Sequence, residues 1–293
     1  MAAATTSAGQ HAATRGARIA GLVSCVPHTV VDNSRFIEQF GAASVAEVVK
    51  MIGVQSRRWV GPGESTADLC QRAGEHLLAG LGWAKDSVDG VIFVSQTPDY
   101  LLPATACALQ GRMGLRTGAL AFDVNLGCSG YPYGLWLAMM MVQSGVASRL
   151  LVAVGDTISR VVDPHDRATA MLFGDAGTVT AVERASADDD AHAAHFILGS
   201  DGRGEANLII PEGRFKVRSA EQDARLLGRD LACLYMDGGE IFNFTLGAVP
   251  SLVAGTLAGA HKEVGDYDAF LFHQANLFML KHLVKKTDRK SVV

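Results

Sequence analysis

The stretch DVNLGCSGYPYGLWLAMMM, residues 123–141, joins a strand-like run to a long apolar run and places Cys128 at the junction. Gly127 and Gly130 flank the cysteine and permit a sharp turn there. Proline fits best in the first turn of a helix and is costly further in, so Pro132 predicts a helix start within a residue or two of Cys128. Because this helix is apolar on nearly all sides, we expect it to be central in the fold.

The same alternation of strand and helix extends outward from this stretch. Five continuous apolar runs are typical of strands buried on both faces, and they cover residues 18–26, 90–97, 118–125, 149–156 and 176–183. Helical patterns lie between the runs, one of them capped by Ser65 or Thr66 and another spanning 131–145. This rhythm predicts an α/β fold with a mostly parallel sheet covered by helices.

After an acidic, alanine-rich linker at 183–195, the pattern restarts. It gives a strand in FILGSDG (196–202), two helical segments within 236–265, and a strand in DAFLFHQAN (268–276). The sequence therefore predicts two similar α/β halves. The second half is shorter, and we expect it to be incomplete.

The predicted domain boundaries follow from these patterns. A leader over 1–17 has no apolar core and is expected to be disordered. The first half spans 18–184 and holds Cys128, and the second spans 185–293.

The amino-acid composition excludes several classes of protein. The 293 residues carry a net charge of −4, which gives no electrostatic footprint for nucleic acid. Five cysteines without CxxC spacing argue against a disulfide framework or a zinc knuckle and indicate a reducing compartment. No run reaches the roughly 18 uninterrupted apolar residues of a membrane span. We therefore expect a soluble, cytoplasmic protein that binds no metal, nucleic acid or membrane.

Cys128 is a candidate nucleophile because of its place at a helix start. The positive end of the helix dipole lowers the pKa of a thiol, and backbone N–H groups there can stabilise an oxyanion. A cysteine that only packs in the core is the alternative on these residues alone. His273 follows an apolar strand, and reactive groups collect beyond the carboxyl ends of strands in α/β sheets. A cysteine and a histidine are the minimum for an activated thiol nucleophile.

Four motifs carry a family resemblance. They are DVNLGCSGYPYGL (123–135), DRATAMLFGDAGTVTAV from Asp166, FLFHQAN (270–276) and LLPATACALQGRMGL (101–115). Together, in this order and spacing, they resemble the β-ketoacyl-ACP synthase III family of the thiolase superfamily. The resemblance implies a thiolase-like fold of two similar α/β halves in αβαβα layers, a homodimer, and no cofactor.

The resemblance also implies a reaction and its residues. In the family, an acyl group passes from a thioester to a cysteine, and a decarboxylated malonyl-ACP then attacks it. Cys128 matches the acylated nucleophile and His273 the histidine that assists decarboxylation. Asn276 matches an asparagine that is more positional than chemical, and Gly127 and Gly130 support the nucleophile.

Two further positions match substrate-binding residues of the family. Arg167 aligns with an arginine that contacts coenzyme A, and Leu102 with a residue that often floors the acyl pocket of the partner subunit. The chain departs from the family where Glu47 and Met51 replace a tryptophan and an arginine around the nucleotide. An acyl carrier protein or another thioester donor is therefore favoured over free coenzyme A.

We expect a condensing acyltransferase that loads an acyl group onto Cys128 and joins it to malonyl-ACP, in fatty-acid initiation or a related specialised pathway. Two alternatives are open. One keeps Cys128 and His273 but transfers the acyl group to oxygen or nitrogen without decarboxylation. The other is a catalytically incomplete subunit of a heteromeric synthase.

Overall fold

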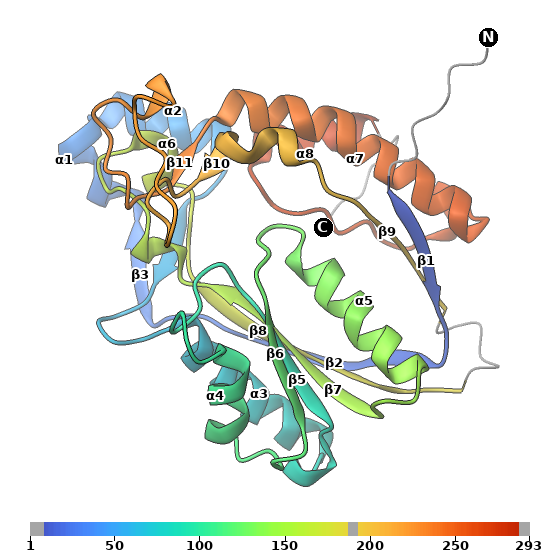
Figure 1. Ribbon diagram of the computed structural model, residues 1–293. Helices are drawn as coiled ribbons and strands as arrows, with labels where there is room; N and C mark the ends of the chain where they lie inside the picture. The colour runs from blue at the N-terminus through green and yellow to red at the C-terminus, as the bar shows by residue number, and fades with distance from the viewer. Residues whose placement is uncertain (1–8, 187–192, 287–293) are drawn as a thin grey trace.

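The first half is built on one five-stranded sheet (Figure 1). The structure is a computed structural model that describes residues 9–186 and 193–286. Strand order is β2-β8-β7-β5-β6, with bounds Ala17–Cys25, Ala176–Arg184, Arg149–Asp156, Gly90–Val94 and Leu120–Val124. Each of the five predicted strands is confirmed within a few residues.

The prediction of a mostly parallel sheet holds for four strands, β2, β7, β5 and β6, and misses the reversed direction of β8. β5 pairs in parallel with β6 and β7, but β8 is antiparallel to both β7 and β2. Parallel neighbours need a crossover, usually a helix that covers the sheet. The connection from β7 to β8 contains only a 3-10 turn and the four-residue α6 (Arg167–Ala170), so β8 returns beside β7 in the opposite direction.

Helices cover both faces of this sheet. α3 (Thr66–Leu81) and α4 (Thr105–Arg112) lie on one face, and α5 (Gly130–Gln143) lies on the other (Figure 1). Side chains alternate along β5, so that Phe93 packs with the α3 side and Ile92 with the α5 side, both fully buried. This two-sided burial explains why the strands read as continuous apolar runs.

The helix starts agree with the sequence pattern. Ser65 caps α3 through a reciprocal pair of hydrogen bonds: its Oγ accepts from the Asp68 N–H (3.3 Å), and its own N–H donates to Asp68 Oδ2 (2.9 Å). α5 starts at Gly130, which places Pro132 in the first turn as predicted.

The interpretation of 1–17 as a disordered leader is wrong for its second part, and residues 1–8 lie outside the described residues. Gln10–Thr14 forms β1, which pairs antiparallel with β9 (Ala194–Leu198). Thr14 is fully buried, and its Oγ1 lies 3.5 Å from Met139 Sδ of α5. Residues 10–14 are therefore ordered by their pairing with β9 and by their packing on α5.

The second half has one long helix where the sequence predicts two. α7 (Gly238–Ala260) continues through Pro250. It contacts β9 and lies on the far side of the β1–β9 pair from α5 (Figure 1). α7 alone among the described helices has the length and hydropathy of a membrane span, which is a weak indication because core helices of soluble proteins also have them.

The strand predicted at 268–276 is also wrong. The segment has no regular secondary structure before α8 (Leu277–Lys286). A strand requires a hydrogen-bonding neighbour, and β9 pairs with β1 alone within the described ranges.

The remaining elements form a side layer. β3 (Thr29–Asp32) pairs with β4 (Ser56–Trp59), and α1 (Ile37–Phe40) and α2 (Ala42–Ile52) pack beside them. β10 (Leu208–Ile209) pairs with β11 (Tyr235–Met236).

Candidate active site

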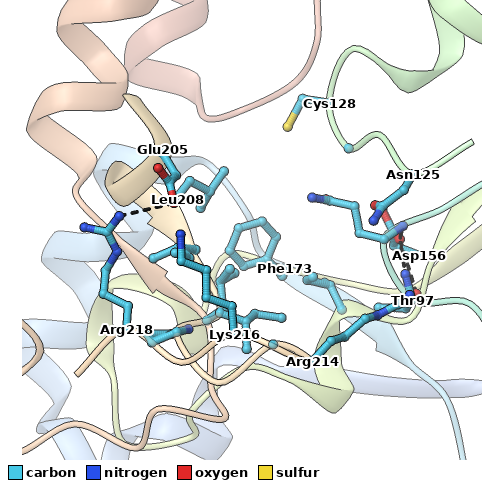
Figure 2. Close-up of a pocket in the computed structure, with 18 of the residues that line it drawn as sticks. Thr97, Asn125, Cys128, Asp156, Phe173, Glu205, Leu208, Arg214, Lys216 and Arg218 are labelled. Carbon is cyan, nitrogen blue, oxygen red and sulfur yellow. Dashed lines mark hydrogen bonds and ion pairs between the residues drawn. The ribbon is translucent and has the colours of Figure 1, made fainter. Parts of the chain in front are cut away.

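The carboxyl ends of β5, β6 and β7 meet at one edge of the sheet, where open α/β sheets place their ligands. A cavity of about 730 Å³ lies there (Figure 2). Both Cys128 and His273 line it. The structure therefore brings together the two residues that sequence reasoning paired, one from each half of the chain. In the described ranges no group of three or more His, Cys, Asp or Glu side chains is placed to hold a metal ion.

Cys128 lies two residues before the first residue of α5, in a tight turn. The Gly130 N–H donates to the Gly127 carbonyl at 2.7 Å. The expected sharp turn is present, but neither glycine has a positive φ, so the backbone conformation of the turn does not itself require glycine. They are needed for close approach instead: a Cβ on Gly130 would lie 2.6 Å from Val94 Cγ1, and one on Gly127 would collide with the Gln96 side chain.

The expected low pKa of Cys128 is not found. Desolvation by the surrounding protein raises the pKa of this thiol, and the charge of Asp156 raises it further, against a lowering by the backbone N–H of Cys128 itself. The thiol is therefore mostly protonated at neutral pH, and a base is needed to form the nucleophile.

His273 has the complementary protonation state. Desolvation lowers the pKa of its imidazole, which favours the neutral form at neutral pH. A neutral imidazole carries one N–H donor and one acceptor nitrogen. It can therefore take a proton or donate a hydrogen bond within the cavity.

Asp156 is a site residue that sequence reasoning missed, although it ends the predicted strand RLLVAVGD. Its Oδ1 accepts hydrogen bonds from the backbone N–H groups of Gln96 (2.7 Å) and Thr97 (3.1 Å) and from the hydroxyls of Ser95 (3.0 Å) and Thr97 (3.2 Å). Asp156 thus ties the end of β7 to the end of β5 and holds Gln96 against Gly127. Desolvation raises the pKa of this carboxyl despite the hydrogen bonds.

Asn276 is not on the cavity wall. Its Oδ1 accepts from the Met279 N–H at 2.7 Å, and its carbonyl accepts from the Leu280 N–H at 3.1 Å. It caps α8 and so fixes the chain shortly after His273.

The two predicted substrate-binding residues also lie away from the cavity wall. Arg167 starts α6, is exposed, and donates to Ser44 Oγ on α2 at 2.8 Å. Glu47 and Met51 are exposed on the same helix. Leu102 is 86% exposed on the loop before α4.

A loop after β10 forms the side of the cavity opposite Cys128 (Figure 2). Arg214 and Lys216 are exposed there, and Arg218 pairs with Glu205 at 3.2 Å. Phe173 and Leu208 lie between the loop and the thiol (Figure 2). Other apolar residues of the lining are Ile158, Ile209, Ile210 and Leu234. The irregular stretch PEGRFKVRS gave no sequence signal for this placement.

Comparison with known proteins decides the family. A sequence model of 3-oxoacyl-[acyl-carrier-protein (ACP)] synthase III matches residues 122–202. The β-ketoacyl-[acyl-carrier-protein] synthase III 2 of Streptomyces coelicolor is 36% identical over 92% of this chain and 76% of its own length. The chain belongs to the β-ketoacyl-ACP synthase III family. It is therefore a condensing enzyme of the acyltransferase class.

Solved synthase structures share the fold. The 3-oxoacyl-(acyl-carrier protein) synthase of Burkholderia xenovorans LB400 superposes with a TM-score of 0.94 at 60% identity, covering 96% of this chain and 80% of that one. The synthase III of Pseudomonas aeruginosa PAO1 superposes with a TM-score of 0.82 at 29% identity, covering 95% of this chain and 82% of that one. The predicted thiolase-like α/β fold is thereby confirmed.

Proposed function

We propose that this synthase III loads an acyl group from a thioester onto Cys128 and condenses it with malonyl-ACP, in fatty-acid initiation or a related specialised pathway. The Cys128 thiolate attacks the thioester carbonyl, the bond to the donor sulfur breaks, and the donor thiol leaves with a proton. Malonyl-ACP then loses carbon dioxide, and its C2 carbanion attacks the acyl carbonyl on Cys128. The β-ketoacyl-ACP departs and the Cys128 thiolate is restored.

The observation that carries this proposal is the shared cavity of Cys128 and His273 in a member of this family. The thiol has a raised pKa and requires a base, and the neutral imidazole of His273 can accept the proton. In the second step the N–H of the same neutral ring can donate to the enolate oxygen that forms as carbon dioxide leaves. Asn276 acts as a positioning residue through its cap on α8.

An acyl carrier protein is the proposed partner. It delivers the malonyl group, and it is also the favoured donor of the acyl group. Arg167 lies beside α2, where Glu47 and Met51 stand in place of the aromatic and guanidinium pair of the family. Neither Glu47 nor Met51 offers Arg167 a ring with which to enclose a nucleotide. This supports donors whose recognition does not depend on an adenine, and coenzyme A is the second choice.

A homodimer is proposed for two reasons. β6 is an edge strand of the central sheet, and an open edge invites pairing with another chain. Its one charged side chain, Asp123, accepts hydrogen bonds from the backbone N–H groups of Thr105 and Ala106 at the start of α4. Tyr100, Leu101 and Leu102 are exposed by 64%, 57% and 86% on the loop before α4. Contact with a second copy would cover this apolar loop and bring Leu102 toward the partner's acyl cavity.

The proposed reaction uses no cofactor, and the proposed location is the cytoplasm. All five cysteines are free thiols, as expected in a reducing compartment.

The test follows both half-reactions on the same protein. We expect intact-mass measurement with butanoyl-ACP or butanoyl-CoA to show one acyl group on Cys128, and radiolabelled malonyl-ACP to release carbon dioxide and give β-ketoacyl-ACP. Cys128→Ser should abolish loading of the thiol. His273→Ala should slow loading, because it removes the base, and should also slow condensation by about 10²–10³, the usual cost of one such donor. Acyl transfer to an alcohol or amine without carbon dioxide release would instead support the non-decarboxylating alternative. Failure to load Cys128 would support the incomplete-subunit alternative.

A further inference from the structure

The active-site cavity is asymmetric in charge. Arg214 and Lys216 line it on the loop side, and neither makes an ion pair with any described residue. Arg218 beside them is already neutralised by Glu205. Figure 2 shows the Lys216 side chain rising from the loop and the Arg214 side chain extending toward Thr97. Two unpaired cations therefore face a space whose opposite side holds the reactive thiol.

The carboxylates of the wall do not satisfy these cations. Glu205 is paired with Arg218, and Asp156 directs Oδ1 to four donors from Ser95, Gln96 and Thr97. His273 adds no positive charge at neutral pH, because desolvation lowers its pKa. The loop side of the cavity therefore favours an anion.

The wall between thiol and cations indicates which anion fits. Phe173 and Leu208 lie there (Figure 2), and their side chains offer no hydrogen bond to the amides of a pantetheine arm. They suit a methylene chain. Polar lining residues, Thr97 and Asn125 among them, lie on the side toward which Arg214 extends. A group bound covalently at Cys128 would run along the apolar wall and end at Arg214 and Lys216.

We infer that the acyl group accepted by this synthase ends in a carboxylate: the thioester carbon is on Cys128, the methylene chain lies against the apolar wall, and Arg214 and Lys216 bind the far carboxylate. The inference rests on the proposed acylation of Cys128. The phosphates of the donor's carrier are the other source of negative charge, and the experiment separates the two.

The experiment compares glutaryl-CoA with pentanoyl-CoA, which have the same number of acyl carbons and differ in the terminal carboxylate. The rate of loading onto Cys128 is measured by intact-protein mass spectrometry at low salt. We expect kcat/KM to favour glutaryl by about tenfold, which equals about 1.4 kcal/mol and is reasonable for two partly exposed ion pairs. In the double variant R214Q/K216Q the ratio should fall to near one.

A matched variant, R184Q/K262Q, removes one arginine and one lysine that are exposed and outside the cavity. It should keep the glutaryl preference. The charge-reversed variant R214E/K216E should turn the preference toward 4-trimethylammoniobutanoyl-CoA. Circular dichroism establishes that each variant is folded.

A third comparison presents the same acyl groups on N-acetylcysteamine, which carries no phosphate. The glutaryl preference should persist there if the acyl end is recognised. Equal loading of glutaryl and pentanoyl groups by the unaltered chain would overturn the inference. A glutaryl preference that disappears with the phosphate-free N-acetylcysteamine donors would also overturn the inference. An equal fall in loading rate for glutaryl-CoA and pentanoyl-CoA in R214Q/K216Q would do the same. Absence of loading from every donor would instead contradict the proposed function.

Discussion

Cys128 and Asp156 line the same cavity, where desolvation raises the pKa of the thiol and the charge of the carboxylate raises it further. All four hydrogen bonds accepted by Asp156 converge on Oδ1. Asparagine keeps an acceptor at that position and removes the charge. The effect of the charge can therefore be separated from the effect of the geometry.

Replacing Asp156 by asparagine should lower the pKa of Cys128 and raise its rate of alkylation by iodoacetamide severalfold at neutral pH. The measurement is the pH dependence of alkylation at Cys128, followed by peptide mass spectrometry. Asp175→Asn is the control, because Asp175 uses both carboxylate oxygens and is not among the groups that shift the Cys128 thiol. An unchanged pH profile in Asp156→Asn would show that the carboxylate does not act on the thiol.

The same residue predicts a pH dependence of stability. The pKa of Asp156 is raised in the folded protein, so the folded state binds more protons at this group than the unfolded state does. Its contribution to stability is therefore present at low pH and lost as pH rises from about 3.8 through the folded-state pKa. The unaltered chain should lose stability relative to Asp156→Asn across that window in urea titrations. A constant difference between the two would contradict the raised pKa.

Close packing at the start of α5 gives a third prediction. In Gly130→Ala the new Cβ would lie 2.6 Å from Val94 Cγ1, and such overpacking costs about 1–3 kcal/mol. Gly247→Ala, in α7, has nothing within 4 Å of the new Cβ and should stabilise the helix by about 1 kcal/mol. Thermal and urea unfolding compare the two variants. Gly130→Ala should also reduce loading of Cys128, because the collision lies at the turn that holds the thiol. The double variant Gly130→Ala with Val94→Ala should remove the collision and restore that loading.

The cap of α8 separates a positioning role of Asn276 from a chemical one. Asn276→Ala should cost about 1 kcal/mol and speed hydrogen exchange in α8, whereas Asn276→Asp keeps the cap. If Asn276 only positions the chain after His273, the aspartate variant retains condensation activity. Loss of condensation in the aspartate variant with an intact α8 would place the amide in the chemistry instead.

The proposed homodimer is tested at the exposed apolar loop before α4. Leu102→Lys should shift the mass measured by light scattering at micromolar concentration from two chains toward one, because it places charge in the apolar contact. Leu227→Lys is the control, since Leu227 is also highly exposed, at 79%, and lies in a different part of the fold. A mass of one chain for the unaltered protein would argue against the homodimer.

The sequence predicted the elements of the first half well because local patterns determine them. β5 and β7 are buried on both faces, and Ser65 and Pro132 mark helix starts by their own chemistry. The direction of β8 was not predictable, because it depends on the path of the connection after β7 rather than on the composition of either strand. For the same reason 268–276 reads as a strand by composition while no described strand pairs with it.

In the candidate site, too, local sequence features were predictable, whereas features that depend on tertiary context were not. Cys128 was found from its place at a helix start, and His273 from an expected strand end. The structure places both in one cavity, although the segment before His273 is not a strand. Asp156, Arg214 and Lys216 escaped sequence reasoning because their importance comes from what they face across the cavity. The pKa of Cys128 was predicted in the wrong direction, because the helix dipole is visible in the sequence whereas desolvation is not.

β1 precedes the first half in the chain, yet it pairs with β9 of the second half and packs through Thr14 and Arg15 onto α5. The two halves are therefore interlocked by an exchanged strand, not merely joined end to end. A single backbone cleavage between β8 and β9 should leave two fragments that stay associated under native conditions. Removal of β1 from the intact chain should do more damage than that cleavage, since it takes away the strand that spans the junction.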